Sequence, residues 1–443
     1  MVSSFPNPAS IDLSRVRLAI RSLQPQLVEW RRRLHQKPEL GFQEKLTAEF
    51  ISSKLQTWEI NHQTGIAKTG IVATIKGTKP PTPTQHSSLL TQHSSPAKRR
   101  ATANSTQHSP LSTQHSSLST HKVLAIRADM DALPIQELNE VPYCSQHDGV
   151  MHACGHDGHT AIALGTAYYL QQHRQDFAGT VKIIFQPAEE SPGGAKPMIE
   201  AGVLKNPDVD AIIGLHLWNN LPLGTVGVRS GALMAAVELF DCKILGKGGH
   251  GAIPHQTVDS VVVAAQIVNA LQTIVARNVN PIDSAVVTVG ALHAGTTHNV
   301  IADTATMKGT VRYFNPAFQG FFHQRIEQII AGICQSHGAK YDLEYGSLYP
   351  PVINDTSITE LVRSVAEEIV ETPMGIVPEC QTMGGEDMSF FLQEVPGCYF
   401  FLGSANPEKD LAYPHHHPRF DFDETALGIG VEIFIRCVEK FFS

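Results

Sequence analysis

The stretch MHACGHDGHTA (residues 151–161) places three histidines, one cysteine and one aspartate among glycines, directly before an apolar run that extends to Leu170. Cys154 and His156 form a Cys-x-His pair at the expected start of a helix. A thiolate and an imidazole together suit zinc, manganese, cobalt or iron better than calcium or magnesium. The partial positive charge at the start of the helix is expected to lower the pKa of the thiol. A histidine-rich surface loop beside a buried cysteine explains the pair equally well, so the decision depends on ligands elsewhere in the chain.

Apolar strands on both sides of this stretch alternate with helices. The segments Val123–Arg127, Thr180–Gln186 and Ala211–Trp218 have the continuous apolar character of strands that are buried on both faces. The alternation predicts an α/β domain with helices on both faces of a mostly parallel sheet. In such sheets, ligands bind beyond the carboxyl ends of the strands. The polar residues that end or follow these strands are Asp129, Asp131, Glu189, Glu190 and His216.

The beginning of the chain has helical periodicity. Apolar residues recur at helical spacing from Leu13 to His35, and Pro25 is expected to divide this segment into two helices. The same pattern predicts a further helix over Gln43–Trp58, and Gly70–Gly77 is typical of a short strand.

Between residues 230 and 345 the pattern changes to strand, helix, strand, strand, helix, strand. That order is the ferredoxin-like split arrangement. The α/β character returns afterwards, with a helix expected at Thr356–Glu371 and a strand at Cys398–Leu402. The sequence therefore predicts one domain built from residues 1–229 and 346–443, with residues 230–345 inserted as a second domain.

Residues 78–121 have a different composition. The tetrapeptide Thr-Gln-His-Ser recurs at 84–87, 91–94, 106–109 and 113–116, surrounded by serine, threonine and proline. A segment of this kind cannot bury enough apolar area to offset the entropy cost of ordering it. We predict a disordered insertion in a surface loop, and we do not count its histidines as evidence for a metal site.

Charge and composition limit the class of protein. The chain has 443 residues, of which 42% are hydrophobic, and a formal net charge of -8. The acidic balance argues against nucleic acid or an anionic membrane as the main partner. No apolar run is long enough to span a bilayer, and the first residues do not have the pattern of a secretory signal. Seven cysteines scattered singly are typical of a protein of the reducing cytoplasm.

Further candidate groups lie outside the opening stretch. In QPAEE (186–190), Glu189 and Glu190 suit a division into a general base and a metal ligand, although an exposed acidic turn is the alternative. His216 lies in an apolar strand, where a histidine is more often a core residue than a ligand. The segment PHHHPRF (414–420) offers three more imidazoles, and GGEDM (384–388) is typical of a capped helix start.

Two glycine-bearing loops of the inserted domain carry His250 and Asn299, but neither loop is specific alone. The sequence has no serine nucleophile elbow, no P-loop and no dinucleotide-binding glycine fingerprint.

Four motifs together resemble those of the metal-dependent amidohydrolases in the aminoacylase/carboxypeptidase metallopeptidase group. They are RADMDALP (127–134), the opening stretch, QPAEE (186–190) and HHPRFDF (416–422), in that order. Within the group, the chain is similar to indole-acetyl-amino-acid hydrolases, hippurate hydrolases and N-acyl-L-amino-acid amidohydrolases. The likeness extends from about Trp30 to the last residue, apart from the repeat insertion, and it implies an α/β metallopeptidase domain with a ferredoxin-like (βαββαβ) lid.

The resemblance implies a site for two divalent metal ions, either Mn²⁺ or Zn²⁺, with Co²⁺ also possible. Its ligands would be Cys154, His156, Glu190, His216 and His416. Cys154 stands where relatives outside this subgroup have a bridging aspartate, so its thiolate is expected to bridge the two ions. His415 stands where these hydrolases commonly have an apolar residue, which leaves His415 and His416 both open as the last ligand.

The resemblance also implies roles for residues around the metal ions. Glu189 corresponds to the general base, and Asp131 to a carboxylate that orients a ligand by holding an imidazole N–H. His250 and Asn299 correspond to lid residues that help to polarise the scissile carbonyl. Arg312 corresponds to a lid arginine suited to a substrate carboxylate.

The expected activity is hydrolysis of the amide bond of small N-acyl-L-amino acids by a metal-activated water, with Glu189 accepting the proton and passing it to the departing amine. A dipeptidase or an N-acetyl-diamino-acid deacetylase of the same group is an alternative, as is a non-catalytic metal-binding protein. The preferred acyl group, amino acid and metal are left open. So is a homodimer formed through the lid domain, in which the lid histidine of one subunit reaches the site of the other, as in dimeric relatives.

Overall fold

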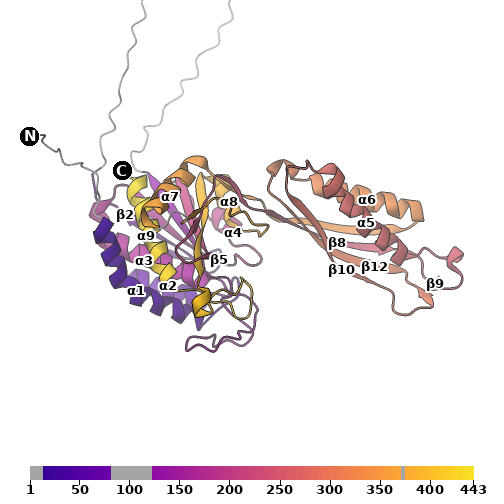
Figure 1. The fold of residues 1–443 in the computed structure, drawn as a ribbon, viewed down its shortest axis with the longest axis horizontal. Coiled ribbons are helices and arrows are strands. Elements are labelled where there is room, and N and C mark those ends of the chain that lie inside the picture. The colour runs from indigo at the N-terminus through magenta and orange to yellow at the C-terminus, as the bar shows by residue number, and fades with distance from the viewer. Residues whose placement is uncertain (1–12, 81–121, 371–374) are drawn as a thin grey trace, which may run out of the picture.

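The computed structural model describes residues 13–80, 122–370 and 375–443. The predicted repeat insertion lies outside the described residues, apart from its first three positions. The described chain has two large sheets, and the domain built on the smaller of them extends away from the larger domain (Figure 1).

The larger sheet has eight strands in the order β1-β2-β4-β3-β5-β16-β6-β15. Its central strands β4, β3, β5 and β16 run parallel to one another. On one side β2 is antiparallel to both β4 and β1, and on the other side β6 is antiparallel to β16. Every residue of β3, β4 and β16 is buried, which explains why these strands do not alternate between apolar and polar residues. The bounds are β1 Asn61–Ile66, β2 Gly70–Lys76, β3 Val123–Asp129, β4 Thr180–Gln186, β5 Ala211–Pro222, β6 Val226–Gly227, β15 Ile376–Val377 and β16 Gly397–Ala405.

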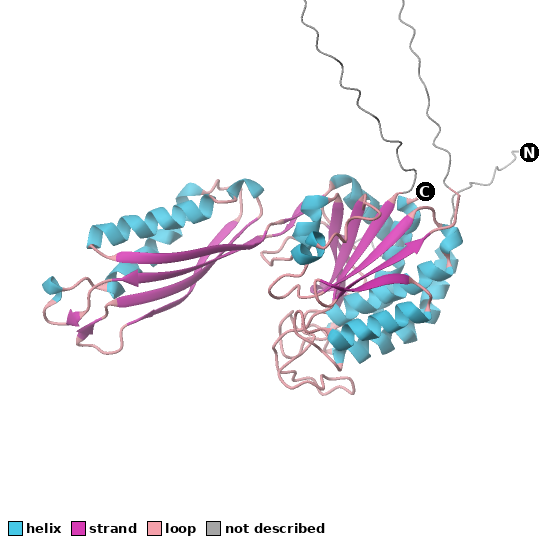
Figure 2. Ribbon diagram, turned by 180° about the vertical axis from the view of Figure 1, so that it is seen from behind, coloured by secondary structure: helices cyan, strands magenta, loops and turns pink. Residues whose placement is uncertain are grey.

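Helices cover both faces of this sheet (Figure 2), and the α/β prediction is confirmed. Alternate strand residues point into two separate cores, so that Ile183 faces one layer of helices and Ile184 faces the other. The first layer consists of α1 Leu13–His35, α2 Lys45–Thr57, α3 His156–Gln172, α7 Thr356–Ile369 and α9 Thr425–Phe441, and the second of α4 Ala195–Glu200 and α8 Met388–Glu394.

The predicted break at Pro25 is wrong, because α1 is one helix that contains this proline. Proline inside a helix costs about 3 kcal/mol through a lost hydrogen bond and a steric clash. On the N-terminal side of Pro25, α1 buries Ile20 and Leu23, and on the C-terminal side it buries Leu27 and Trp30. Burying four such side chains stabilises by roughly 1.5–3 kcal/mol each, so packing on both sides outweighs the cost of the proline.

The smaller sheet has four antiparallel strands in the order β10-β12-β8-β13, with α5 and α6 on one face. The element order along the chain is βαββαβ, as predicted, although β13 continues past Tyr345 to Tyr349. The division of the chain into residues 1–229 with 346–443 and an inserted 230–345 stays a prediction. The bounds are β8 Ala236–Leu245, α5 Ser260–Asn278, β10 Ala285–Ala294, β12 Thr304–Tyr313, α6 Phe321–His337 and β13 Lys340–Tyr349.

Two short ribbons mark the ends of this smaller domain, which we call the lid. At its base, β7 (Gly231–Met234) pairs with β14 (Val352–Asn354). At its tip, β9 (Gly249–His250) pairs with β11 (Val300–Ile301), and β9 lies at the end of the lid farthest from the larger domain (Figure 1).

Among the described residues, α5 is the one helix that is long and apolar enough to cross a membrane by length and composition. It packs on the lid sheet through Val263, Ile267, Leu271 and Ile274, which are all fully buried. The core of the lid therefore explains the buried apolar face of α5, whereas Val261 and Val262 of the same helix are exposed.

Candidate metal centre

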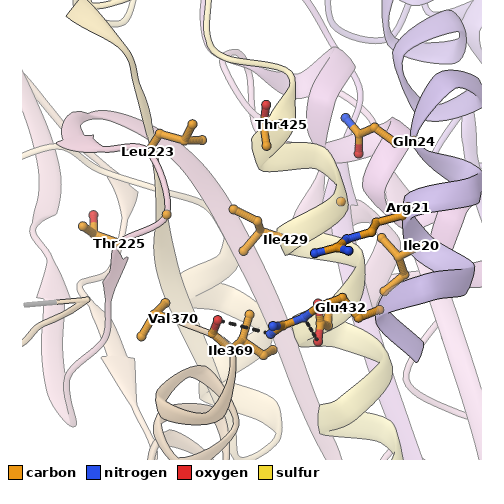
Figure 3. Close-up of a pocket in the computed structure, with 13 residues that line it drawn as sticks. Ile20, Arg21, Gln24, Leu223, Thr225, Ile369, Val370, Thr425, Ile429 and Glu432 are labelled. Atoms are coloured by element: carbon orange, nitrogen blue, oxygen red, sulfur yellow. Dashed lines mark hydrogen bonds and ion pairs between the residues drawn. The ribbon is translucent and has the colours of Figure 1, made fainter. Parts of the chain in front are cut away.

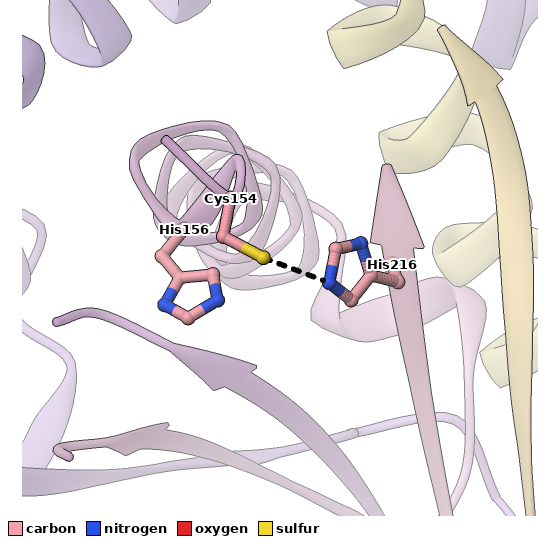
Figure 4. A group of neighbouring side chains, drawn as sticks. All are labelled: Cys154, His156 and His216. Atoms are coloured by element: carbon pink, nitrogen blue, oxygen red, sulfur yellow. Dashed lines mark hydrogen bonds between the residues drawn. The ribbon is translucent and has the colours of Figure 1, made fainter. Parts of the chain in front are cut away.

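The carboxyl ends of the central parallel strands bring the predicted ligands together. Glu190 follows β4. His216 lies in β5, and Cys154 and His156 flank Gly155, the residue directly before the helical part of α3 (Figure 4). Gly155 between them has a φ of 90°, a left-handed conformation that favours glycine, and it turns the chain so that both side chains reach the same space.

The five predicted ligands form overlapping groups in which one donor atom of each residue lies within 4.8 Å of the others. One group is Cys154, His156 and His216; a second is Cys154, Glu190 and His416. The Cys154 Sγ lies 3.5 Å from His216 Nε2, and the Glu190 Oε1 lies 3.1 Å from His416 Nε2. With metal–ligand bonds of about 2.0–2.3 Å, two ligands of one tetrahedral ion lie about 3.5 Å apart, so these separations suit a shared cation.

Hydrogen bonds fix which imidazole nitrogen is available as a donor to a metal ion. The Nδ1 of His156 lies 3.0 Å from the backbone oxygen and 3.2 Å from Oδ1 of Asp131, and the Nδ1 of His216 lies 2.6 Å from the Leu217 oxygen. Because these partners only accept, each Nδ1 carries the hydrogen and donates it. The Nε2 atoms are left for a metal ion, and the Nε2 of His156 is buried with no hydrogen-bond partner.

The two neighbouring histidines near the end of the chain have different surroundings. The Nε2 of His415 donates to the Leu217 oxygen at 2.9 Å, and its ring stacks on Trp218. His416 has a left-handed φ of 63°, and its ring reaches Glu190. The structure therefore brings His416, and not His415, into the group with Cys154 and Glu190.

Asp131, in the motif RADMDALP, contacts both the opening stretch and the motif QPAEE. Besides its bond to His156, its carboxylate accepts the backbone N–H of Glu189 at 3.0 Å and of Glu190 at 3.1 Å. One carboxylate thus holds an imidazole and both members of the glutamate pair, which is the arrangement that a carboxylate behind a metal site needs.

The site has more buried carboxylates than buried cations to neutralise them. Around the ligands lie Asp129, Asp131, Glu189, Glu386 and Asp387, all at most 6% exposed. Arg127 binds Asp129, Glu386 and Asp387 at 2.7–2.8 Å. Burial, followed by Glu386 and Glu190, raises the pKa of Glu189 well above its usual value. A buried excess of negative charge is expensive unless cations bind to it.

The titration of two ligands supports the same conclusion. Burial raises the pKa of the Cys154 thiol, and Glu190 and Glu189 raise it further. The prediction that the helix start lowers this pKa is therefore wrong for the protein alone, because burial and two carboxylates outweigh the helix dipole. Burial opposes protonation of His156, but Asp129 and Asp131 raise its pKa to about 10. A bound cation would take the place of these protons, so sulfur, nitrogen and oxygen donors together fit divalent metal ions.

Several residues of the site were not identified from the sequence. His159 donates from Nδ1 to Asp129 at 2.6 Å and accepts the Leu217 N–H at Nε2, 2.8 Å away. Asp387, in the predicted capped helix start, binds Gln186 and the backbone N–H groups of Gly194 and Ala195. The spacing of His159, one turn after His156, was the only local signal, since the other contacts join distant segments.

The predicted lid residues lie apart from the metal ligands. His250 is in β9, and the backbone oxygen of Asn299 accepts the Gly251 N–H at 2.8 Å, so both residues sit at the lid tip. Both are exposed, and among the described residues His250 belongs to no group of candidate ligands. Arg312 lies instead at the base of the lid, where a Cβ on Gly385 would be 3.4 Å from its Nη1. Burial lowers the pKa of Arg312.

A cavity of about 560 Å³ lies elsewhere on the larger domain, between α1, α9 and the end of α7 (Figure 3). Apolar side chains, including Ile20, Leu223 and Ile429, line it together with the ion pair of Arg17 and Glu432. None of the predicted ligands lines this cavity, so its size says nothing about the metal centre.

Comparison with known proteins agrees with the motifs. A family model described as "Peptidase family M20/M25/M40" matches residues 125–440. An N-acetyl-L-cysteine deacetylase of Bacillus subtilis is 38% identical, over 92% of this chain and 86% of its own. An N-acyl-L-amino acid amidohydrolase of Geobacillus stearothermophilus is 40% identical, over 76% and 80% of the two chains. The solved structure of a Bacillus subtilis dinuclear metal binding peptidase from the M20 family has a TM-score of 0.75 and 34% identity, over 95% of this chain and 99% of its own.

Proposed function

The chain belongs to the peptidase family M20/M25/M40 and is an amidohydrolase, and from that premise we propose that it hydrolyses the amide bond of N-acyl-L-amino acids. The observation that carries the proposal is the group formed by His156, Glu189 and Glu190, in which a candidate general base stands beside candidate metal ligands. A site that only stored metal would not need a second, deeply buried carboxylate at that position.

Cys154, His156, Glu190, His216 and His416 would hold two divalent ions, for which we propose manganese or zinc. When bound, these ions supply positive charge that makes a water more acidic and polarises the substrate carbonyl. Glu189 accepts the proton of the attacking water and gives it to the nitrogen of the departing amine. Asp131 keeps Glu189 and Glu190 in place through their backbone N–H groups.

The proposal is tested with metal-loaded protein on matched small substrates. N-acetyl and N-benzoyl L-amino acids are expected to be hydrolysed, with release of the free amino acid measured by chromatography. Dipeptides with a free amino group are the comparison. If the protein cleaves only the dipeptides, the proposed substrate class is wrong and the protein is a dipeptidase.

Arg312 provides a control within the same panel. Because its guanidinium lies at the base of the lid, we propose that it binds the substrate carboxylate. Arg312→Ala should raise KM for an N-acetyl-amino acid about 10- to 100-fold, which corresponds to the loss of a charge-assisted hydrogen bond. The corresponding N-acetyl-amino acid amide, which lacks the carboxylate, should be affected much less. An equal loss for both substrates would exclude this role.

We further propose that the lid forms a homodimer and that its tip acts in the site of the partner subunit. His250 and Asn299 lie at the far end of the lid, away from the ligands of their own chain. The strand β10 is at the edge of the lid sheet and exposes Leu292, so it offers an unpaired edge to a second copy.

Mixing two inactive variants separates action on the partner from action within one chain. Glu189→Gln removes the base and His250→Ala removes the tip imidazole. If the tip serves the partner's site, an equal mixture that exchanges subunits should recover about a quarter of wild-type activity, because half of the dimers then contain one intact site. No recovery in a mixture whose subunits have been shown to exchange would refute the arrangement.

The scattered cysteines support the cytoplasm as the place of action, where a metal-bound thiolate persists. The proposed partner of the site is a small N-acyl amino acid.

A further inference from the structure

Tyr349 connects the lid to the loop that carries Glu189. It is the last residue of β13 and is 9% exposed, and its hydroxyl donates to the backbone oxygen of Glu189 at 2.7 Å. Its ring packs edge-on against Phe390 and lies so close to Gly193 that a Cβ there would be 3.3 Å away. The lid base therefore touches both ends of the loop formed by residues 188–194.

The N–H groups of this loop are held by carboxylates of the larger domain. Ala188 donates to Glu44 at 2.9 Å, while Glu189 and Glu190 donate to Asp131. Gly194 and Ala195, at the far end, both donate to Asp387 at 2.9 Å. The carbonyl of Glu189 is instead held from the lid, by Tyr349.

The loop needs these anchors because its backbone is strained. Ala188 has a φ of 54°, in the left-handed region that residues with a side chain rarely adopt. Such a conformation persists only where surrounding contacts over-determine it. Loss of one anchor beside Ala188 would therefore allow the chain to relax and would change the direction of the Glu189 side chain.

We propose that Tyr349 is a positioning residue for the reaction and that its hydroxyl links the placement of the lid to the orientation of Glu189. The inference rests on the proposed role of Glu189 as general base. Arg312 lies at the same lid base, in β12, and both Arg312 and Tyr349 pair with Val237 of β8. A substrate carboxylate bound by Arg312 would therefore shift the strand ends beside Tyr349. Binding of the substrate carboxylate and alignment of Glu189 then occur together.

The test is Tyr349→Phe in the full-length, metal-loaded protein. We expect kcat to fall about tenfold while KM changes less than twofold and metal content stays constant, because only the alignment of the base is lost. Amide hydrogen exchange, followed by mass spectrometry, should become faster in peptides that cover residues 188–195. A side chain with a merely structural role would lower the melting temperature without this separation of kcat from KM.

Tyr313→Phe is the matched control, since the Tyr313 hydroxyl also makes a buried hydrogen bond in the lid, to Glu238 at 2.9 Å, but away from the loop. It should leave kcat and the exchange of residues 188–195 unchanged. Unchanged exchange in Tyr349→Phe, or faster exchange with unchanged kcat, would each overturn the proposal. If the wild type hydrolyses no amide in the panel, the proposed function fails, and the exchange measurement still decides whether Tyr349 holds the loop.

Discussion

Glu189→Gln is expected to lower kcat for an N-acyl-amino acid by about 10²- to 10⁴-fold, the range by which general acid–base catalysis accelerates reactions. Glutamine keeps the size of the side chain and its capacity to form hydrogen bonds, but it cannot accept the proton of a water at neutral pH. The backbone bond from Glu189 to Asp131 does not involve the side chain, so the loop should keep its shape. Steady-state kinetics with a saturating substrate measure the effect.

The adjacent glutamate makes this experiment specific. Glu190→Gln should lose bound metal, measured as metal ions per chain by atomic emission, whereas Glu189→Gln should keep the wild-type content. The two side chains differ in their surroundings: Glu190 reaches His416, while Glu189 lies beside Glu386 and Asp387. If Glu189→Gln remains fully active, another group is the base.

Removal of the sulfur ligand should have the second large effect. Cys154 belongs to two of the candidate ligand groups, so its loss affects both halves of the site. We expect Cys154→Ala to bind fewer metal ions per chain and to lose at least about 100-fold in kcat, because the thiolate charge that offsets the two cations is gone. Chelation of the wild type should abolish hydrolysis, and manganese or zinc should restore it.

Two neighbours serve as controls for this loss. Cys144→Ala, at a half-buried cysteine outside the ligand groups, should keep both metal and activity. His415→Ala should keep most of its metal and His416→Ala should not, since the Nε2 of His415 is bound to the Leu217 oxygen. A Cys154→Ala protein with full metal content would show that sulfur does not bind the ions.

The sequence alone was enough for the parts of the molecule that depend on local pattern. The buried strands and the βαββαβ order of the lid follow from periodicity, because burial repeats with the period of the element. Cys154, His156, Glu190 and His216 were candidates because of their spacing or because they end or follow buried strands, whereas the full ligand set, including His416, came from the resemblance of the four motifs to a known family. Because ligands bind at the carboxyl ends of parallel strands, polar residues from distant segments could be assigned to one site.

The features that were missed depend on contacts between distant segments. Arg127 reads as one more residue of a buried strand, yet it binds Asp387, 260 positions away. The bond of Tyr349 to Glu189 has a backbone oxygen as acceptor, and every residue has such an oxygen, so no side-chain pattern could indicate it. Pro25 was misjudged because its local cost is known, whereas the packing that overcomes it comes from α3 and α9.

The order of elements along the chain has a consequence for biosynthesis. The lid and its basal ribbon are complete once Asn354 has left the ribosome, but the larger domain then still lacks the loop with His416 and the helix α9, which packs against both α1 and α3. The lid can thus fold while α1 and α3 still expose apolar surface, a state in which chaperones would bind. A metal ion held by all five proposed ligands could bind only later still, because His416 is translated after the lid.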